Sequence, residues 1–214
     1  MKIGLIGVDS KKFPNLALMK ISAFHKSKGD SVEFVNHFYN YDIVYKSKVF
    51  VFTDDNNFKV NTKQFFKGGT GYYNTDKKAF KNVLPKEIEH VKPDYNLYHF
   101  EKYKDCAFGF LTRGCPNHCK FCIVPEKEGA IKPYADIDEF LDGRKKVIFL
   151  DNNVLACKHG LEQIKKLVDK EIKVDFNQGL NAKMIAENSD IAKLLSKLKW
   201  HKQLRMACDS KGSM

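Results

Sequence analysis

Short apolar runs and amphipathic segments alternate over the first 72 residues. The run Lys2–Val8 is almost continuously apolar, which is typical of a buried parallel strand. A helix is predicted to begin at Pro14, with apolar residues at three- and four-residue spacing, and to end at Gly29. Further strands are predicted at 31–35, 48–53 and 64–67. This order predicts a Rossmann-like α/β domain over residues 1–72.

A second alternating region follows residues 73–104, which are polar, aromatic and marked by prolines and are expected to be a linker. Within 105–214, strands are predicted at 107–112, 147–150, 174–176 and 204–207, and helices around 137–141, 161–168 and 191–198. The alternation predicts a partial (β/α) barrel of about four parallel strands, with its chemistry at their carboxyl ends. The expected fold class is therefore α/β, a Rossmann-like domain followed by this partial barrel.

Composition and charge narrow the class of protein. Hydrophobic residues make up 43% of the 214 residues, which is enough for a packed core. The chain contains no apolar run of the roughly 18 residues that span a bilayer, and it begins without a secretory-signal pattern. We therefore expect a soluble, cytoplasmic protein without membrane contact. The net charge of +11 suggests nucleic acid, but the lysines are spread along the chain, which favours an ordinary basic surface.

Three of the six cysteines lie within eight residues, directly after the first predicted barrel strand. Cys115, Cys119 and Cys122 form a C-x3-C-x2-C pattern. Thiolates suit zinc or iron–sulfur clusters. A structural zinc site takes four ligands, and His118 is poorly placed as the fourth because it adjoins Cys119. A four-iron cluster with one open iron is therefore favoured. The other cysteines are interpreted as small buried apolar residues, or else as a second three-cysteine site: Cys106, Cys157 and Cys208.

With Phe121 in the aromatic position, the motif resembles that of the radical S-adenosylmethionine superfamily, over roughly residues 105–209. The resemblance implies that Cys115, Cys119 and Cys122 hold a [4Fe–4S] cluster whose open iron binds S-adenosylmethionine. It implies reductive cleavage of S-adenosylmethionine to a 5′-deoxyadenosyl radical that acts on an unknown substrate. It also implies an electron donor of the flavodoxin or ferredoxin kind.

Polar residues at the ends of the later barrel strands are candidate contacts for S-adenosylmethionine or substrate. One group occupies the place after the second strand where the family often carries a Gly-Gly-Glu-like segment. Others follow the third strand or lie on and after the fourth. Strand-end capping or an ion pair is the alternative for each. The predicted cofactor-binding residues are Phe121, Asp151, Asn152, Asn153, Asn177, Gln178, Gly179, Arg205 and Asp209.

The first domain resembles the cobalamin-binding modules that such radical enzymes often carry. Ligation in those modules commonly uses an Asp-x-His-x-x-Gly loop after the first strand, and here Asp9–Phe13 contains no histidine. A histidine-ligated cobalamin is therefore not expected, while another binding mode stays open. The glycines of 68–71 either allow close approach of a ligand or simply make a turn, and the turn is favoured.

Two alternatives to a complete radical enzyme stay open. The family barrel usually has more than the four strands predicted here. The chain is accordingly expected to be a truncated or split form, with a partner or a second copy covering its last strand. The first alternative is thus a truncated, non-catalytic iron–sulfur-binding protein. The second alternative is an RNA methylthiotransferase, suggested by charge and domain order. It ranks lower because no cysteine precedes Cys106, whereas those enzymes carry further cysteines in their first domain.

Overall fold

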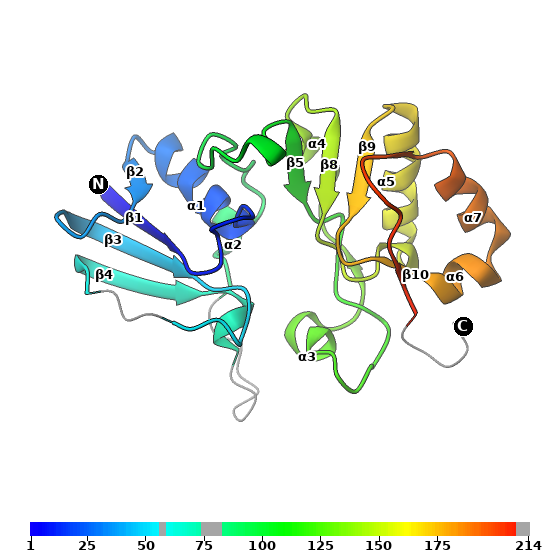
Figure 1. Ribbon diagram of the computed structural model, residues 1–214, viewed down its shortest axis with the longest axis horizontal. Coiled ribbons are helices and arrows are strands. Elements are labelled where there is room, and N and C mark those ends of the chain that lie inside the picture. Colours follow the sequence, from blue (N-terminus) through cyan, green and yellow to red (C-terminus); the bar gives the residue numbers. More distant parts are fainter. Residues whose placement is uncertain (56–58, 74–82, 209–214) are drawn as a thin grey trace. The chain divides into compact units, whose positions relative to one another are not determined.

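The computed structural model describes residues 1–55, 59–73 and 83–208. The chain divides into two compact units, Met1–Lys104 and Asp105–Met214 (Figure 1). The described part of 73–104, expected to be a linker, lies in the first unit. No helix among the described residues is long and apolar enough to cross a membrane.

The first unit is a four-stranded parallel sheet in the order β2-β1-β3-β4. Its elements are β1 (Lys2–Gly7), α1 (Leu16–Ser27), β2 (Ser31–Phe34), β3 (Asn40–Ser47) and β4 (Asn61–Gly68). Asn15 caps α1 by accepting from the amide of Leu18. Gly29, at φ +78°, lies just beyond the helix end. The predicted Rossmann-like α/β fold is confirmed.

The strand predicted at 48–53 is wrong. These residues form loops and turns, and the third strand lies upstream, at Asn40–Ser47. Phe52 is 87% exposed, so the apolar run that suggested a strand faces solvent. The segment 40–47, in which Tyr41, Ile43, Val44 and Tyr45 alternate with or adjoin polar residues, forms a strand that pairs with β1 on one side and β4 on the other.

After β4 the first unit continues through short helices at η1 (Thr70–Tyr72), α2 (Lys86–Glu89) and η2 (Glu101–Tyr103). This segment packs on α1. The amide of Asp94 donates to the carbonyl of Met19 at 3.0 Å, and the hydroxyl of Ser22 donates to the Asp94 carboxylate at 2.7 Å. These contacts hold the described end of the expected linker against the first sheet's helix.

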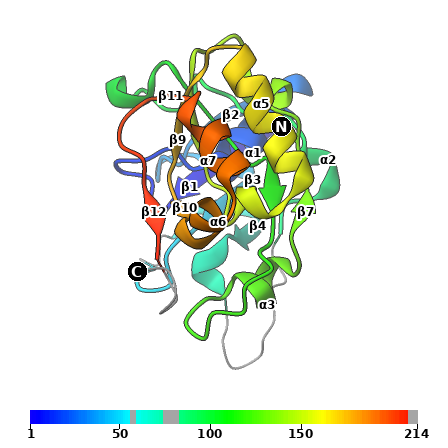
Figure 2. The same cartoon turned by 90° about the vertical axis from the view of Figure 1, so that its right-hand side faces the viewer.

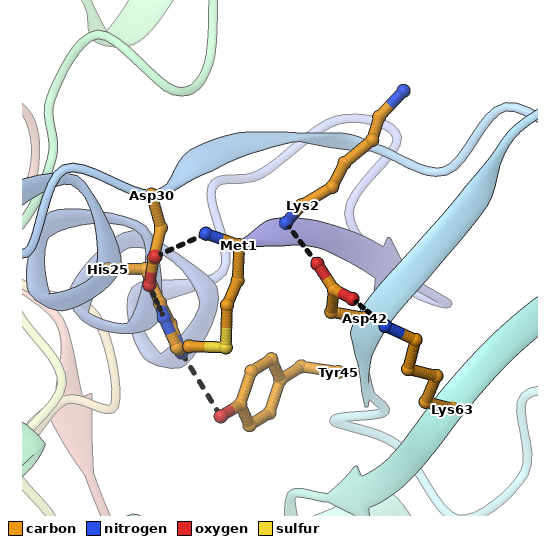
Figure 3. Close-up of polar contacts among 7 residues, drawn as sticks. All are labelled: Met1, Lys2, His25, Asp30, Asp42, Tyr45 and Lys63. Atoms are coloured by element: carbon orange, nitrogen blue, oxygen red, sulfur yellow. Dashed lines mark hydrogen bonds and ion pairs between the residues drawn. The ribbon is translucent and has the colours of Figure 1, made fainter.

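Polar contacts join the amino-terminal ends of the strands to α1 in the first unit. Figure 3 shows them among Met1, Lys2, His25, Asp30, Asp42, Tyr45 and Lys63. The imidazole of the buried His25 lies 2.7 Å from Asp30 and 3.1 Å from the Tyr45 hydroxyl. Hydrogen bonds from the Met1 amine and from His25 lower the pKa of Asp30. The contacts link helix and strands where the first sheet begins.

The second unit contains a parallel sheet in the order β11-β9-β8-β5. Its strands are β5 (Cys106–Gly109), β8 (Lys146–Phe149), β9 (Lys173–Phe176) and β11 (Lys199–Trp200). The accompanying helices are α4 (Asp138–Leu141), α5 (Lys158–Asp169), α6 (Ala182–Glu187) and α7 (Ser189–Ser196). In Figure 1, α5 runs alongside the strands and α7 flanks α5. Strand residues such as Val147, Phe149 and Val174 are fully buried in this core.

Two predicted barrel strands are wrong in extent or place. The segment 107–112 divides into β5 and β6 (Thr112–Arg113), and β6 pairs antiparallel with β7 (Lys132–Pro133). The segment 204–207 contains β12 (Met206–Ala207), which pairs with β10 (Leu180–Asn181) outside the four-stranded sheet (Figure 2). The fourth place in the sheet belongs to β11. A two-residue strand has no periodicity to predict, so its partner depends on tertiary contacts.

Candidate functional site

The three-cysteine loop leaves the sheet at the carboxyl end of β5 and contains the short helix α3 (Val124–Glu128), seen below β5 in Figure 1. The two ends of the loop meet. Gly114 has φ +83°, and a Cβ there would lie 2.3 Å from the carbonyl oxygen of Ala130. The amide of Cys115 donates to the carbonyl of Gly129 at 3.2 Å. Only glycine suits this crossing, which fixes where Cys115 emerges.

The cysteines of this loop are half-buried and form no disulfide among the described residues. The amide of Cys122 donates to the carbonyl of Cys119, and the amide of Asn117 donates to Cys115 Sγ at 3.4 Å. Phe121 is 75% exposed. The part of the chain that the structure describes assembles no group of three or more His, Cys, Asp or Glu side chains that could hold a metal ion. The donor chemistry is present, and the three sulfurs do not converge.

Asp151, directly after β8, binds the start of the cysteine loop. Its Oδ1 accepts from the amide of Thr112 at 2.6 Å and from the Thr112 hydroxyl at 2.8 Å. The amide of Leu111 also donates to this carboxylate, at 3.0 Å. Burial raises the pKa of Asp151 to about 6, against the lowering effect of these hydrogen bonds. Asp151, predicted from the sequence to contact a cofactor, thus accepts hydrogen bonds from the backbone amides of Leu111 and Thr112 and from the Thr112 hydroxyl.

Asn152 contacts the end of the same loop through Glu128. The Asn152 amide donates to Glu128 Oε2 at 3.0 Å, and the backbone amide of Gly114 donates to the same oxygen at 3.0 Å. Glu128 also pairs with Arg113 at 2.9 Å and with Lys127 at 3.3 Å. Sequence reasoning missed Glu128, because a Glu-Lys-Glu run in a short helix resembles an ordinary solvated surface.

Asn153 is buried beside Cys115. Its side-chain nitrogen donates to Cys115 Sγ at 3.6 Å. Its Oδ1 is buried and has no hydrogen-bond partner among the described residues. A buried acceptor without a donor is costly, and natural proteins usually satisfy it. A ligand with an N–H group could satisfy this oxygen next to the cysteine loop.

The predicted residues between β9 and β10 and directly before β12 have other surroundings. Asn177 and Gln178 are exposed, and Gly179 turns the chain at φ +85°. Arg205 forms an ion pair with Asp175, a buried carboxylate on β9. Asp209 lies outside the described residues. The structure therefore brings 151–153 to the cysteine loop and gives Arg205 a protein partner.

The other three cysteines do not form a second metal site within the described part of the chain. Cys106 starts β5, so it lies at the opposite end of that strand from the cysteine loop. Its sulfur is 3.9 Å from His201 Nε2, and burial raises the pKa of the Cys106 thiol. Cys157 is also buried, whereas Cys208 is exposed. The first two fit the interpretation as small buried apolar residues.

The loops at the carboxyl end of the first sheet are filled by the chain itself. A Cβ on Gly69, at φ +102°, would lie 2.3 Å from the carbonyl oxygen of Lys48, and one on Gly71 would lie 2.4 Å from Lys48 Cγ. Asp9 Oδ2 accepts from the amides of Val49 and Phe50, at 2.5 and 3.2 Å. Gly69 and Gly71 therefore allow the chain to pack closely on Lys48, whose atoms occupy the space that a ligand would need.

A parallel sheet with a three-cysteine loop at its carboxyl end, in a chain that also contains a Rossmann-like unit, is the arrangement expected of radical S-adenosylmethionine proteins with a cobalamin-binding-like domain. No protein-family model matches the chain. The chain is similar in structure to the radical S-adenosylmethionine methyltransferase TsrM from Kitasatospora setae, with cobalamin and a [4Fe–4S] cluster bound. The TM-score is 0.57 at 11% identity, covering 93% of this chain and 57% of that one.

Two curated proteins match in sequence. The tRNA-2-methylthio-N(6)-dimethylallyladenosine synthase of Karelsulcia muelleri (strain GWSS) is 34% identical over 122 residues, 51% of this chain and 24% of that protein. The bacteriochlorophyllide d C-12(1)-methyltransferase of Chlorobaculum tepidum (strain ATCC 49652 / DSM 12025 / NBRC 103806 / TLS) is 28% identical over 116 residues, 47% of this chain and 25% of that protein. The chain thus matches about a quarter of each relative's length. Together the matches confirm the resemblance to radical S-adenosylmethionine proteins with a cobalamin-binding-like domain.

Proposed function

We propose that this chain binds a [4Fe–4S] cluster through Cys115, Cys119 and Cys122 and reductively cleaves S-adenosylmethionine. The observation that carries the proposal is the buried, unsatisfied Oδ1 of Asn153 beside Cys115. An open iron at the cysteine loop would bring the amino group of S-adenosylmethionine near this oxygen, and an amino group is the donor that the oxygen lacks. The Asn153 side chain would then orient the ligand.

The neighbouring residues have supporting roles in this proposal. Asp151 holds the strand end that leads into the loop, and Asn152 holds the end of the loop through Glu128. The exposed ring of Phe121 is available to cover bound ligand. When bound, the cluster supplies one electron, taken from an external donor of the flavodoxin or ferredoxin kind, and the sulfonium C–S bond breaks to give methionine and a 5′-deoxyadenosyl radical.

Cobalamin is not part of the proposed mechanism. The structural neighbour contains it, but the loop Asp9–Phe13 offers no histidine, and Asp9 is occupied by two backbone amides. The glycines at the end of β4 are packed against Lys48. The residues present at this edge do not fit a histidine-ligated corrinoid.

The test is anaerobic reconstitution of the whole chain with iron and sulfide, followed by reduction with dithionite in the presence of S-adenosylmethionine. We expect four irons per chain within error, iron–sulfur absorption, and 5′-deoxyadenosine as a product. Cys119→Ala is the control and should give neither cluster nor product. Zinc without iron, or a loaded cluster that forms no 5′-deoxyadenosine, contradicts the proposal. The second result would favour the non-catalytic iron–sulfur alternative.

A second candidate is transfer of a methyl or methylthio group. The three proteins described above are named for methyl or methylthio transfer, and the substrates in two of the names are as different as tRNA and a bacteriochlorophyllide. The same reaction mixtures, supplemented with total RNA, separate the two candidates. Methyl transfer releases S-adenosylhomocysteine, so its appearance only with an added acceptor supports this candidate. Formation of 5′-deoxyadenosine alone supports simple reductive cleavage.

A further inference from the structure

The carboxylate of Glu128 makes four polar contacts, with Gly114, Asn152, Arg113 and Lys127. Its side chain is only 6% exposed. One oxygen accepts from the Gly114 amide and the Asn152 side chain, each at 3.0 Å. The other faces Arg113 at 2.9 Å and Lys127 at 3.3 Å. A buried carboxylate with this many charge-assisted contacts is costly to disturb, because its removal takes away all four contacts at once.

These contacts join three segments that are distant along the chain. Gly114 immediately precedes Cys115 at the start of the loop, Glu128 ends α3 at its far side, and Asn152 follows β8. The carboxylate therefore ties the cysteine loop at both of its ends to the sheet. Arg113 is further held by the ring of Phe110, whose centroid lies 4.0 Å from the guanidinium carbon.

Glu128 brings a negative charge to two neighbouring cations. Arg113 and Lys127 are two cations within 3.3 Å of one carboxylate, and Lys127 is buried enough that desolvation lowers its pKa. Replacing the carboxylate by a neutral amide would remove a negative charge that lies within 3.3 Å of both cations, in a region of low dielectric constant. A positive charge left next to a cluster stabilises its reduced, more negative state.

We infer that Glu128 is a positioning residue for the cluster, holding the Cys115 end of the loop in place and balancing the charge of Arg113 and Lys127. The inference rests on the proposed function for its cluster readouts, and it also makes a prediction for the metal-free chain. Glu128→Ala removes both the acceptor and the charge. Glu128→Gln keeps an acceptor for Gly114 or Asn152 and removes only the charge.

The experiment compares wild type, Glu128→Gln, Glu128→Ala and a control, Glu162→Ala. Glu162 is a half-exposed acid in the same unit, paired on the surface with Lys158. In the metal-free chain, iodoacetamide labelling of Cys115 is followed by peptide mass spectrometry. After reconstitution, iron per chain, the electron paramagnetic resonance spectrum and the midpoint potential of the cluster are measured.

In the metal-free chain, we expect Glu128→Ala to label at Cys115 several-fold faster than wild type, with buried Cys106 still protected as a sign of intact folding. After reconstitution, Glu128→Ala should retain several-fold less iron. Glu128→Gln should retain iron near the wild-type level, with a midpoint potential shifted in the positive direction and an altered spectrum. Glu162→Ala should match wild type in every readout.

Equal Cys115 labelling in wild type and Glu128→Ala, with unchanged potential in Glu128→Gln, overturns the inference. If both Glu128 variants lose protection at Cys106, the residue serves folding alone and the inference is also overturned. Absence of a cluster in wild type overturns the proposed function instead, and the labelling result then decides whether Glu128 positions Cys115.

Discussion

The two units have sheets of the same parallel kind, and the loops at the carboxyl ends of their strands have opposite characters. In the first unit, Asp9 Oδ2 accepts from two backbone amides, and Lys48 fills the space beside Gly69 and Gly71. In the second unit, Asn153 has a buried oxygen without a partner among the described residues, beside a loop of three cysteines. The loops of the first region pack against their own chain, although Ser10 Oγ there is also buried without a hydrogen-bond partner among the described residues. The second region combines its unpartnered oxygen with three thiols.

This difference teaches that a candidate ligand site is recognised where potential ligand donors gather beside a polar atom that the fold leaves unsatisfied. Parallel α/β sheets bind ligands at the carboxyl ends of their strands, and that rule alone would nominate both regions. Glycines in the first unit looked suitable for ligand approach, and the atoms that approach them belong to Lys48. An unpartnered buried polar atom costs free energy in either region, since Ser10 Oγ is one in the first unit and Asn153 Oδ1 is one in the second. The three-cysteine loop beside Asn153 is what distinguishes the second region.

The largest expected effect falls on the second region. Cys115→Ser should abolish cluster binding, because a hydroxyl is a poor ligand for an iron that thiolates hold. The measurement is iron and acid-labile sulfide per chain after anaerobic reconstitution. Cys208→Ser, at an exposed cysteine, is the matched control and should bind iron like wild type. Full iron content in Cys115→Ser would contradict the proposal that Cys115 is a ligand of the cluster.

The next effect concerns the first region. Gly69→Ala should destabilise the first unit by about 3 kcal/mol, because its Cβ meets the Lys48 carbonyl and φ is +102°. Gly29→Ala, at φ +78° with no atom within 4 Å of a Cβ, should cost only about 1 kcal/mol. Urea unfolding followed by circular dichroism measures both.

The single tryptophan, Trp200, lies in the second unit, so its fluorescence reports on that unit separately. Gly69→Ala should leave the fluorescence transition and the iron content unchanged. Equal costs for the two glycine variants, or a loss of iron in Gly69→Ala, would contradict the view that the first region is closed by self-packing.

An effect of similar size to that of Gly69→Ala is expected in the pH dependence of the free energy of unfolding of the second unit. The pKa of Asp151 is raised by burial to about 6, so the folded unit holds this proton more tightly than the unfolded chain does. The stability contributed by this group is therefore fully present below its usual pKa of 3.8 and is lost as the pH rises through 6.

Asp151→Asn removes that titration. Relative to the variant, wild type should lose about 2 to 3 kcal/mol of stability between about pH 4 and pH 7. Urea unfolding followed by Trp200 fluorescence at several pH values gives the difference. A wild type that gains stability over the variant as the pH rises would contradict the raised pKa.

The smallest effect is expected at the opposite end of the second sheet. Cys106→Ala should cost about 1 kcal/mol, because it removes one buried sulfur from a packed strand. Iron per chain should not change. A fall in iron content would revive the second three-cysteine site as an explanation for Cys106.

The sequence by itself determined the features that depend on neighbours along the chain. One such feature is the spacing of Cys115, Cys119 and Cys122, because three thiols within eight residues lie in the same loop whatever fold the rest of the chain adopts. The buried strands at 147–150 and 174–176 and the apolar face of α5 are others, because their periodicity reflects local geometry.

Tertiary structure decided everything that depends on partners far apart in sequence. The segment 40–47 became a strand and 48–53 did not, because pairing with β1 and β4 outweighs local apolar content. Asp151 meets Thr112 across 39 residues, and Asn152 meets Glu128 across 24. Side-chain partners of this kind have no periodic signal. The cysteine motif could therefore be predicted from the sequence. The residues that hold it in place, Asp151, Asn152 and Glu128, could not, because the fold alone brings the strand ends and the loop together.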